Sequence, residues 1–359
     1  MTRSKTPAHR RPVTHRRACG LRAEVASLSA GVFAALLLPG LAQAQAIERH
    51  LPGVAPGTAA PLATPKIPEP EQDPTPIGPA LRALVILGPT DPVHGQSADG
   101  VDVSAVPRLN RDAKTVKKIL APYLGRPMSR QLIAQVGTAL AQYYRSANYP
   151  FVAFSAPEQD ITNGVLQLRA IEFVAGDITT KGTSRHGAAF IASHVDLKSG
   201  EAVNSRDLTY DITWLNRYPF RQVQPVLSPG KTLGQTDLML AATETAPFTL
   251  YAGYSNSGSP ELGTDRYDVG GSIGGLLGPE SLLAYQAAGS DKGTEAHPKY
   301  ISQALTYVLP TGLHKQLEIT ADAVETNQPT QPPFAARQII DELNIGYRFA
   351  VSDLSLIHI

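Results

Sequence analysis

The sequence predicts two tandem α+β modules, each with the order strand, helix, helix, strand, strand, followed by about six antiparallel strands that begin a membrane β-barrel. Three observations support this fold class. Residues 81–246 carry an internal repeat, residues 247–353 alternate between apolar and polar side chains, and the joins between the alternating segments are long and short in turn. No apolar run after the N-terminal one approaches the roughly 20 residues of a membrane-spanning helix, so any membrane domain is expected to consist of strands.

Residues 1–44 have the pattern of a secretory signal peptide. A basic region precedes the apolar run Ala30–Leu38, and Leu41–Ala44 resembles a small-residue cleavage site. The segment holds seven basic residues and one acidic residue, so its removal takes the formal net charge from +1 to −5. That charge argues against a nucleic-acid partner, which would require a basic stripe. The sole cysteine, Cys19, lies in the same segment, which excludes disulfides and thiol catalysis in the mature chain.

Residues 45–80 are predicted to be a proline-rich linker. Nine prolines recur between positions 52 and 79, separated mainly by Ala, Gly and Thr. This composition favours extended polyproline II and cannot bury a core. We therefore expect a semi-rigid spacer before the first folded module.

Three landmarks recur in the same order in residues 81–171 and 172–246. A turn glycine precedes a helix N-cap, a Tyr-Pro-Phe sequence ends that helix, and the pattern L-x-L-x-A-x-E forms a closing strand. The copies begin at Gly125 and Gly200, at Tyr149 and Tyr218, and at Leu166 and Leu238, with offsets of 75, 69 and 72 residues. Proline stops each helix and makes the residue before it extended.

Apolar spacing places the elements within each module. The first module is expected to have strands at 84–87, 151–154 and 165–171, a helix at 116–124, and a second helix with Leu132, Ile133, Val136 and Leu140 on one face. The second is expected to have strands at 171–178, 223–227 and 237–241, a helix at 188–194, and another with Leu208, Ile212 and Leu215 on one face. Each module thus places two helices on one face of a three-stranded sheet.

This tandem order resembles a pair of POTRA domains. The stretch Trp214–Arg221, followed by Pro225, Leu227, Pro229, Gly230, Gly234 and Thr236–Leu238, is similar to the second POTRA domain of two-partner secretion outer-membrane transporters, the haemolysin secretion/activation family (ShlB/FhaC/HecB type). The resemblance covers residues 81–353. It implies that residues 81–171 are POTRA domain 1, that residues 172–246 are POTRA domain 2, and that the following strands belong to an outer-membrane β-barrel.

Residues 247–353 are predicted to be the N-terminal part of that transmembrane barrel. Strands are expected near Phe248, Arg266, Ser281, Lys299, Leu313 and Gln338. The joins at 256–265, 290–298 and 325–337 are long, and those at 277–280 and 310–312 are short. Short periplasmic turns that alternate with long external loops are typical of outer-membrane barrels. A soluble β-sandwich is the alternative.

Six strands alone would leave two unpaired edges in lipid. We therefore expect a C-terminally truncated chain, since the resemblance implies a 16-stranded barrel with a pore loop. Residues 354–359 also resemble the translation of a sequencing adapter. An ordinary strand end is the alternative interpretation of this tail.

No candidate catalytic, cofactor-binding or metal-binding site is found in the sequence. Between the predicted signal peptide and the adapter-like tail, six histidines lie singly and are expected on the surface: His50, His94, His186, His194, His297 and His314. Gly253–Ser257 starts like a nucleophile elbow but lacks its closing glycine. We therefore expect that the protein is not an enzyme and needs no cofactor.

The candidate functional residues lie on two strand edges. An open strand beside a helix can accept a strand from an unfolded polypeptide, with backbone hydrogen bonds giving affinity and side-chain pockets giving specificity. The residues expected to line these edges are Phe151, Val152 and Phe154 in the first module, and Phe220, Val223 and Val226 in the second. Plain core packing is an equally good interpretation of any single one of them.

The resemblance implies a function in protein secretion. The chain would capture an unfolded, secreted adhesin or haemolysin in the periplasm of a Gram-negative bacterium and thread it through the outer membrane without nucleotide. Its partners would be this exoprotein and outer-membrane lipid, with no nucleic acid, and a monomer is expected. The alternatives are an outer-membrane protein assembly or insertion factor, and a periplasmic binding scaffold with a soluble β domain.

Overall fold

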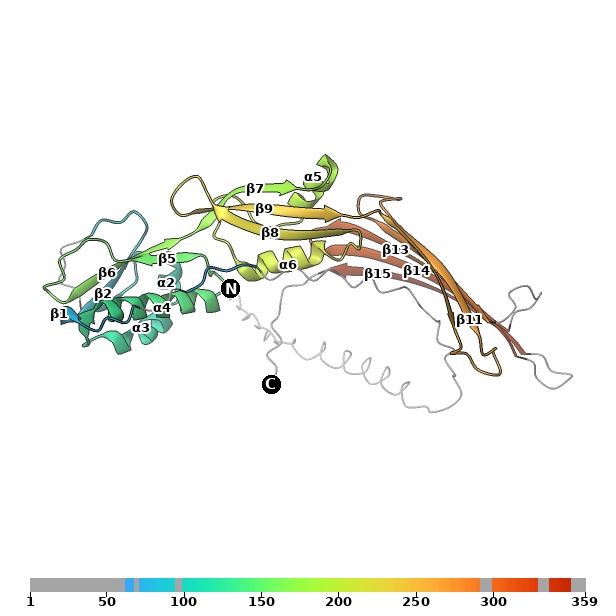
Figure 1. Ribbon diagram of the computed structural model, residues 1–359, viewed down its shortest axis with the longest axis horizontal. Helices are drawn as coiled ribbons and strands as arrows, with labels where there is room; N and C mark the ends of the chain where they lie inside the picture. The colour runs from blue at the N-terminus through green and yellow to red at the C-terminus, as the bar shows by residue number, and fades with distance from the viewer. Residues whose placement is uncertain (1–61, 68–70, 94–98, 291–298, 329–335, 350–359) are drawn as a thin grey trace, which may run out of the picture. The chain divides into compact units, whose positions relative to one another are not determined.

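The computed structural model describes residues 62–67, 71–93, 99–290, 299–328 and 336–349. All of them lie in one compact unit of the chain, Ile47–Ile359. The predicted signal peptide at 1–44, the linker residues 45–61 and the predicted adapter-derived tail at 354–359 lie outside the described residues. Figure 1 shows small α+β domains and a sheet of long strands.

The first domain is built on a four-stranded sheet in the order β3-β2-β6-β5. The strands are β2 (Ala83–Leu87), β3 (Gly100–Asp102), β5 (Val152–Ser155) and β6 (Val165–Glu172). The helices are α2 (Pro107–Arg111), α3 (Ala113–Leu120), the 3-10 turn η2 (Ala121–Tyr123) and α4 (Arg130–Ser146). β2 is parallel to β3 and β6, whereas β5 is antiparallel to β6 and forms one edge. The predicted element order is present, with β3 and α2 as additions.

The predicted linker ends earlier than residue 80. β1 (Pro76–Ala80) pairs antiparallel with β4 (Pro127–Ser129), and its register is irregular. The strand β1 contains two prolines and, within the described residues, pairs on one side only. A proline is tolerated where its nitrogen faces the free edge of a strand, because no ladder hydrogen bond is lost there. Leu81, directly after β1, is fully buried, so this short strand leads the chain into the core.

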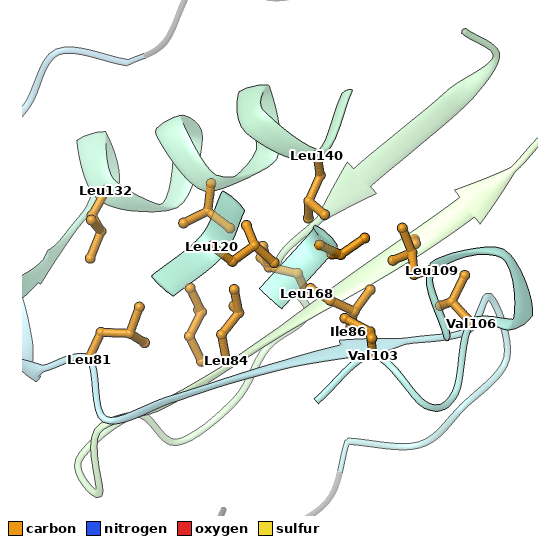
Figure 2. Packing of buried hydrophobic residues seen from close by; sticks show 14 of the residues in the cluster. Leu81, Leu84, Ile86, Val103, Val106, Leu109, Leu120, Leu132, Leu140 and Leu168 are labelled. Carbon is orange, nitrogen blue, oxygen red and sulfur yellow. The ribbon is translucent and has the colours of Figure 1, made fainter. Parts of the chain in front are cut away.

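The core of the first domain lies between its helices and its sheet (Figure 2). α4 begins at the N-cap Ser129, whose Oγ accepts a hydrogen bond from the Leu132 N–H at 3.1 Å. A spacing of four then buries Leu132, Val136, Leu140 and Tyr144 on one face of the helix. Figure 2 shows Leu132 and Leu140 extending from α4 on the side that faces the sheet strands. The predicted apolar face of this helix therefore packs on the sheet.

The second domain has a three-stranded sheet in the order β7-β9-β8. Its strands are β7 (Val174–Lys181), β8 (Arg221–Pro229) and β9 (Gln235–Glu244), and its helices are α5 (Arg185–Ser193) and α6 (Ser205–Leu215). The sequence predicts the opening strand at 171–178, but β7 begins at Val174 because Ile171 still pairs with Ala153 in the first domain. The N-cap Asn204 accepts hydrogen bonds from the Arg206 and Asp207 N–H groups and starts α6.

The remaining strands form one six-stranded antiparallel sheet in sequence order. They are β10 (Phe248–Ser255), β11 (Arg266–Gly274), β12 (Leu282–Ser290), β13 (Tyr300–Gly312), β14 (Lys315–Gln328) and β15 (Ala336–Phe349). The six predicted strands are confirmed. The short join predicted at 310–312 is wrong, because β13 continues to Gly312 and the turn is Leu313–His314, where His314 has a left-handed φ of 53°.

Exposure alternates along strands such as β10 and β12, as the period-two pattern predicts, whereas β15 is exposed almost throughout. Leu250 on β10 is 83% exposed, and the register places it in the same row as the exposed Tyr285 of β12. The next residue of β12, Gln286, points to the opposite face and is 2% exposed. One face therefore carries exposed apolar side chains, while polar side chains are buried on the other, as in a strand between lipid and an aqueous lumen.

Candidate functional site

The first domain has a strand edge that is open among the described residues. β5 pairs with β6 on one side only. The Phe173 N–H donates to the Phe151 carbonyl at 2.9 Å, which makes this a hydrogen-bonded pair of the antiparallel ladder. Because such pairs alternate along a ladder, the backbone N–H and C=O groups of Val152 and Phe154 point away from β6. The open edge thus presents the backbone groups of two predicted site residues.

An apolar groove of about 330 Å³ runs between this edge and α4. Its helix wall includes Ala134, Gly137 and Ala141, whose small side chains leave space beside the strand. On the strand side, Val152 and Phe154 are half-buried and pack against the first core. The Phe154 ring meets the edge of the Tyr144 ring at a centroid distance of 5.8 Å. The groove and the strand edge therefore lie side by side.

Phe151 does not line this edge. It is 7% exposed and packs in the core of the second domain with Ile212 and Val223 among others. The structure supports core packing for this residue, because Phe151 lies opposite Phe173, where the chain passes from β6 into the second domain. Nearby, the buried Tyr144 hydroxyl donates to Glu172 Oε1 at 2.6 Å, and burial raises the pKa of this phenol above its ordinary value.

The corresponding edge of the second domain is closed near the start of β8. β8 is an edge strand, but its Val223 N–H donates to Asn216 Oδ1 at 2.7 Å and the Asn216 Nδ2 donates to the Val223 carbonyl at 3.0 Å. Asn216 and Val223 are both fully buried. The amide side chain thus takes the place that a neighbouring strand would occupy. Phe220 is also buried, and only Val226, 42% exposed, remains accessible.

Two turns of the six-stranded sheet contact the second domain. The buried guanidinium of Arg221 forms an ion pair with Glu280, in the turn between β11 and β12. Burial lowers the pKa of Arg221 to about 10, so the group stays charged at neutral pH. In the turn between β13 and β14, His314 Nε2 lies 2.7 Å from Asp211 Oδ1 on α6. Burial raises the pKa of Asp211 above its ordinary value.

The prediction that the histidines lie on the surface is wrong for two of the three that the structure describes. His194 is 7% exposed because its ring stacks on Phe190 at 4.0 Å. His314 is largely covered, since Tyr210 and Trp214 meet its ring. His186 is exposed, and His50, His94 and His297 lie outside the described residues.

The part of the chain that the structure describes contains no group of three or more His, Cys, Asp or Glu side chains able to hold a metal ion. No helix within these residues is both long and apolar enough to cross a membrane. The open edge of β5, with the groove beside α4, is the best-formed candidate site in the described residues.

The comparisons with known proteins agree with this architecture. Residues 98–172 match the family model for the POTRA domain, ShlB-type. The chain is 27% identical over 188 residues to the outer membrane transporter CdiB of Dickeya dadantii, which covers 52% of this chain and 33% of that protein. It is 23% identical over 180 residues to the heme/hemopexin transporter protein HuxB of Haemophilus influenzae, which covers 49% and 32%. The matched region thus spans about a third of these relatives.

Two solved structures share the fold. CdiB from Escherichia coli superimposes with a TM-score of 0.60 at 21% identity, covering 79% of this chain and 49% of that one. CdiB from Acinetobacter baumannii has a TM-score of 0.55 at 15% identity, covering 92% and 57%. The chain therefore carries a POTRA domain of the ShlB type followed by an antiparallel sheet that resembles the CdiB barrel, and its homologues are two-partner secretion transporters of the outer membrane.

Proposed function

We propose that this protein takes part in exporting an unfolded, secreted exoprotein of the adhesin or haemolysin type across the outer membrane of a Gram-negative bacterium. Its POTRA domains would lie in the periplasm and capture the client, and the strands that follow would form part of the pore. Transport of this kind needs no catalytic residue or cofactor in the chain. The homology to outer-membrane transporters supports protein export in general.

The observation that carries the proposal is the open edge of β5. An extended segment of the client would add antiparallel or parallel to β5 and pair with the outward N–H and C=O groups of Val152 and Phe154. Alternate client side chains would enter the groove beside α4, where apolar ones are favoured by burial. This mode recognises an unfolded chain because a folded client has already paired its own strands.

The second domain is a weaker candidate for the same role. Asn216 already pairs with the Val223 backbone, so a client strand would first have to displace a fully buried amide. Leaving that amide without partners costs about 1–3 kcal/mol. We therefore assign capture to the first domain and a supporting role to the second.

Proline at position 152 tests the assignment. Val152→Pro removes a donor that faces the open edge and leaves the β5–β6 ladder intact, because the 152 N–H points away from β6. The probe is an unfolded two-partner secretion exoprotein of the adhesin or haemolysin type, diluted from urea and titrated calorimetrically into the full chain in detergent. We expect the affinity to fall about tenfold, as the loss of a backbone hydrogen bond and a clash at the edge predict.

Val152→Thr is the matched control, since threonine keeps the shape of valine and retains the N–H group. Its hydroxyl also lines the apolar groove, so the affinity of Val152→Thr, and not that of the unchanged chain, is the reference for Val152→Pro. If Val152→Pro binds as tightly as Val152→Thr, or if the unfolded probe does not bind at all, capture at this edge is refuted.

A further inference from the structure

The groove beside β5 is already in contact with a segment of the same chain. Lys66 and Ile67 line the groove together with residues of α4 and β5. They belong to residues 62–67, here called the strap, which precede β1. Ile67 is half-buried, whereas the neighbouring positions 63–66 are exposed. The one apolar side chain at this end of the strap is therefore the one that enters the groove.

Contacts on both sides hold this region along α4. At the C-terminal end of the helix, the Arg145 guanidinium donates to the Pro65 carbonyl. At the N-terminal end, the Gln131 N–H donates to the Asp73 carbonyl at 3.1 Å, and Arg130 lies 3.5 Å from Glu71. Described residues on both sides of positions 68–70 thus contact α4 near its two ends.

The strap covers the groove but not the strand edge. Within the described residues, no backbone hydrogen bond joins residues 62–67 to β5. Pro65 lies within the strap and Pro61 and Pro68 flank it, so the chain lacks N–H donors at these three positions. It can therefore bury Ile67 in the groove without completing the sheet, whereas a client strand with its full set of donors can do both.

We propose that the strap is an intramolecular competitor for the client groove, and that a client must displace Ile67 before it can occupy the groove beside β5. This inference rests on the proposed function and adds a regulatory step to it. A weak competitor in the groove rejects segments that lack apolar side chains or cannot pair with β5. The apparent affinity for a client is then reduced by the fraction of molecules in which the strap is in place.

Loosening the strap tests the proposal. Ile67→Asp places a charge in the apolar groove and should release the strap, while Thr64→Asp adds the same charge at an exposed position. With the full chain in detergent and the unfolded exoprotein probe, we expect Ile67→Asp to bind about three- to tenfold more tightly, as for a groove that is covered in most molecules. Thr64→Asp should bind as the unchanged chain does.

Fixing the strap provides the opposite perturbation. The mature chain has no cysteine, so Ile67→Cys with Thr138→Cys, two positions that line the groove, allows a reversible cross-link by disulfide or a short reducible linker. The cross-linked chain should bind the probe at least about tenfold more weakly, and reduction should restore binding in the same sample.

The outcomes separate the two proposals. If the probe binds and Val152→Pro weakens it, but neither strap change alters the affinity, the strap is not a competitor and only this inference fails. If Ile67→Asp binds the probe more weakly, Ile67 contributes to client binding instead of competing with the client, and the competitor proposal is overturned. If the probe binds none of the variants nor the unchanged chain, the proposed function itself fails.

Discussion

Replacing Asn216 with alanine is expected to destabilise the second domain by about 2–4 kcal/mol. The Asn216 amide is fully buried, accepts from the Val223 N–H at 2.7 Å and donates to the Val223 carbonyl at 3.0 Å. Alanine removes both hydrogen bonds and leaves two buried backbone groups unpaired. Each such group costs about 1–3 kcal/mol. Two groups would cost about 2–6 kcal/mol, and water that enters the space left by the amide reduces the upper end to about 4 kcal/mol.

Urea unfolding of residues 62–246 measures this change. Both cores are formed by residues within that range, and the only tryptophan, Trp214, reports on the second domain. With a slope of about 2 kcal/mol per molar urea, the midpoint should fall by about 1–2 M. Asn216→Asp keeps the acceptor for the Val223 N–H but places a buried carboxylate against the Val223 carbonyl, so it should lower the midpoint at least as much as alanine does.

Gln222→Ala, at an exposed position of the same strand, is the matched control and should leave the midpoint unchanged. An Asn216→Ala midpoint that differs from the unchanged fragment no more than the Gln222→Ala midpoint does would refute the view that this amide closes the edge of β8.

Two further predictions concern the joint with the sheet and the sheet itself. Because burial raises the pKa of Asp211, its contribution to stability is complete below the ordinary value of 3.8 and is lost as pH rises through the folded-state value. The unfolding midpoint of the full chain, followed by Trp214 fluorescence, should therefore fall with rising pH, and Asp211→Asn should make the midpoint less dependent on pH. Equal pH dependence in the two proteins would contradict this prediction. Leu250→Arg, at an 83% exposed position, should cost about 2–4 kcal/mol if the site faces the bilayer midplane. The measurement is the fraction of heat-modifiable, folded protein on a gel, and an unchanged fraction would argue against a lipid-facing surface.

Much of the fold is predictable because its periodicities are strong. The alternation of apolar and polar residues identifies all six strands of the long sheet, although β15 is exposed on both faces in the structure. The short strands β3 and β4 contain three residues each, too few to show a period. β1 contains two prolines, which made its residues indistinguishable from the linker. These strands are defined by their partners across the sheet rather than by their own sequence.

The candidate site could be predicted only in part. The edge position of β5 follows from the element order, so Val152 and Phe154 are placed correctly beside a helix. Nothing in the spacing shows that Phe151 crosses into the second core. Likewise, an asparagine after a helix is expected to end it, and its bond to a strand seven residues later depends on how the chain turns back.

The stretch that carries the family resemblance, Trp214–Arg221, is explained by these contacts. Asn216 closes β8, and Arg221 pairs with Glu280. A Cβ on Gly274 of β11 would clash with the Tyr218 hydroxyl and the Phe220 ring, so glycine lets these two side chains approach the strand without a shift. The stretch thus joins the second domain to the sheet, which explains why the phenylalanine predicted to face a client is buried.

The backbone at the joints supports this division of roles. Among the described residues, three that are not glycine have a left-handed φ: Asn148, Glu280 and His314. The Asn148 carbonyl accepts the Ser205 N–H of the second domain at 2.9 Å, while Glu280 and His314 contact Arg221 and Asp211. A left-handed residue costs roughly 1–2 kcal/mol, and such strain persists where surrounding contacts over-determine it. The second domain is therefore held on both sides by contacts specific enough to offset strain, whereas the edge of β5 stays open. This difference favours the proposal that the client binds the first domain, while the second domain joins the first to the sheet.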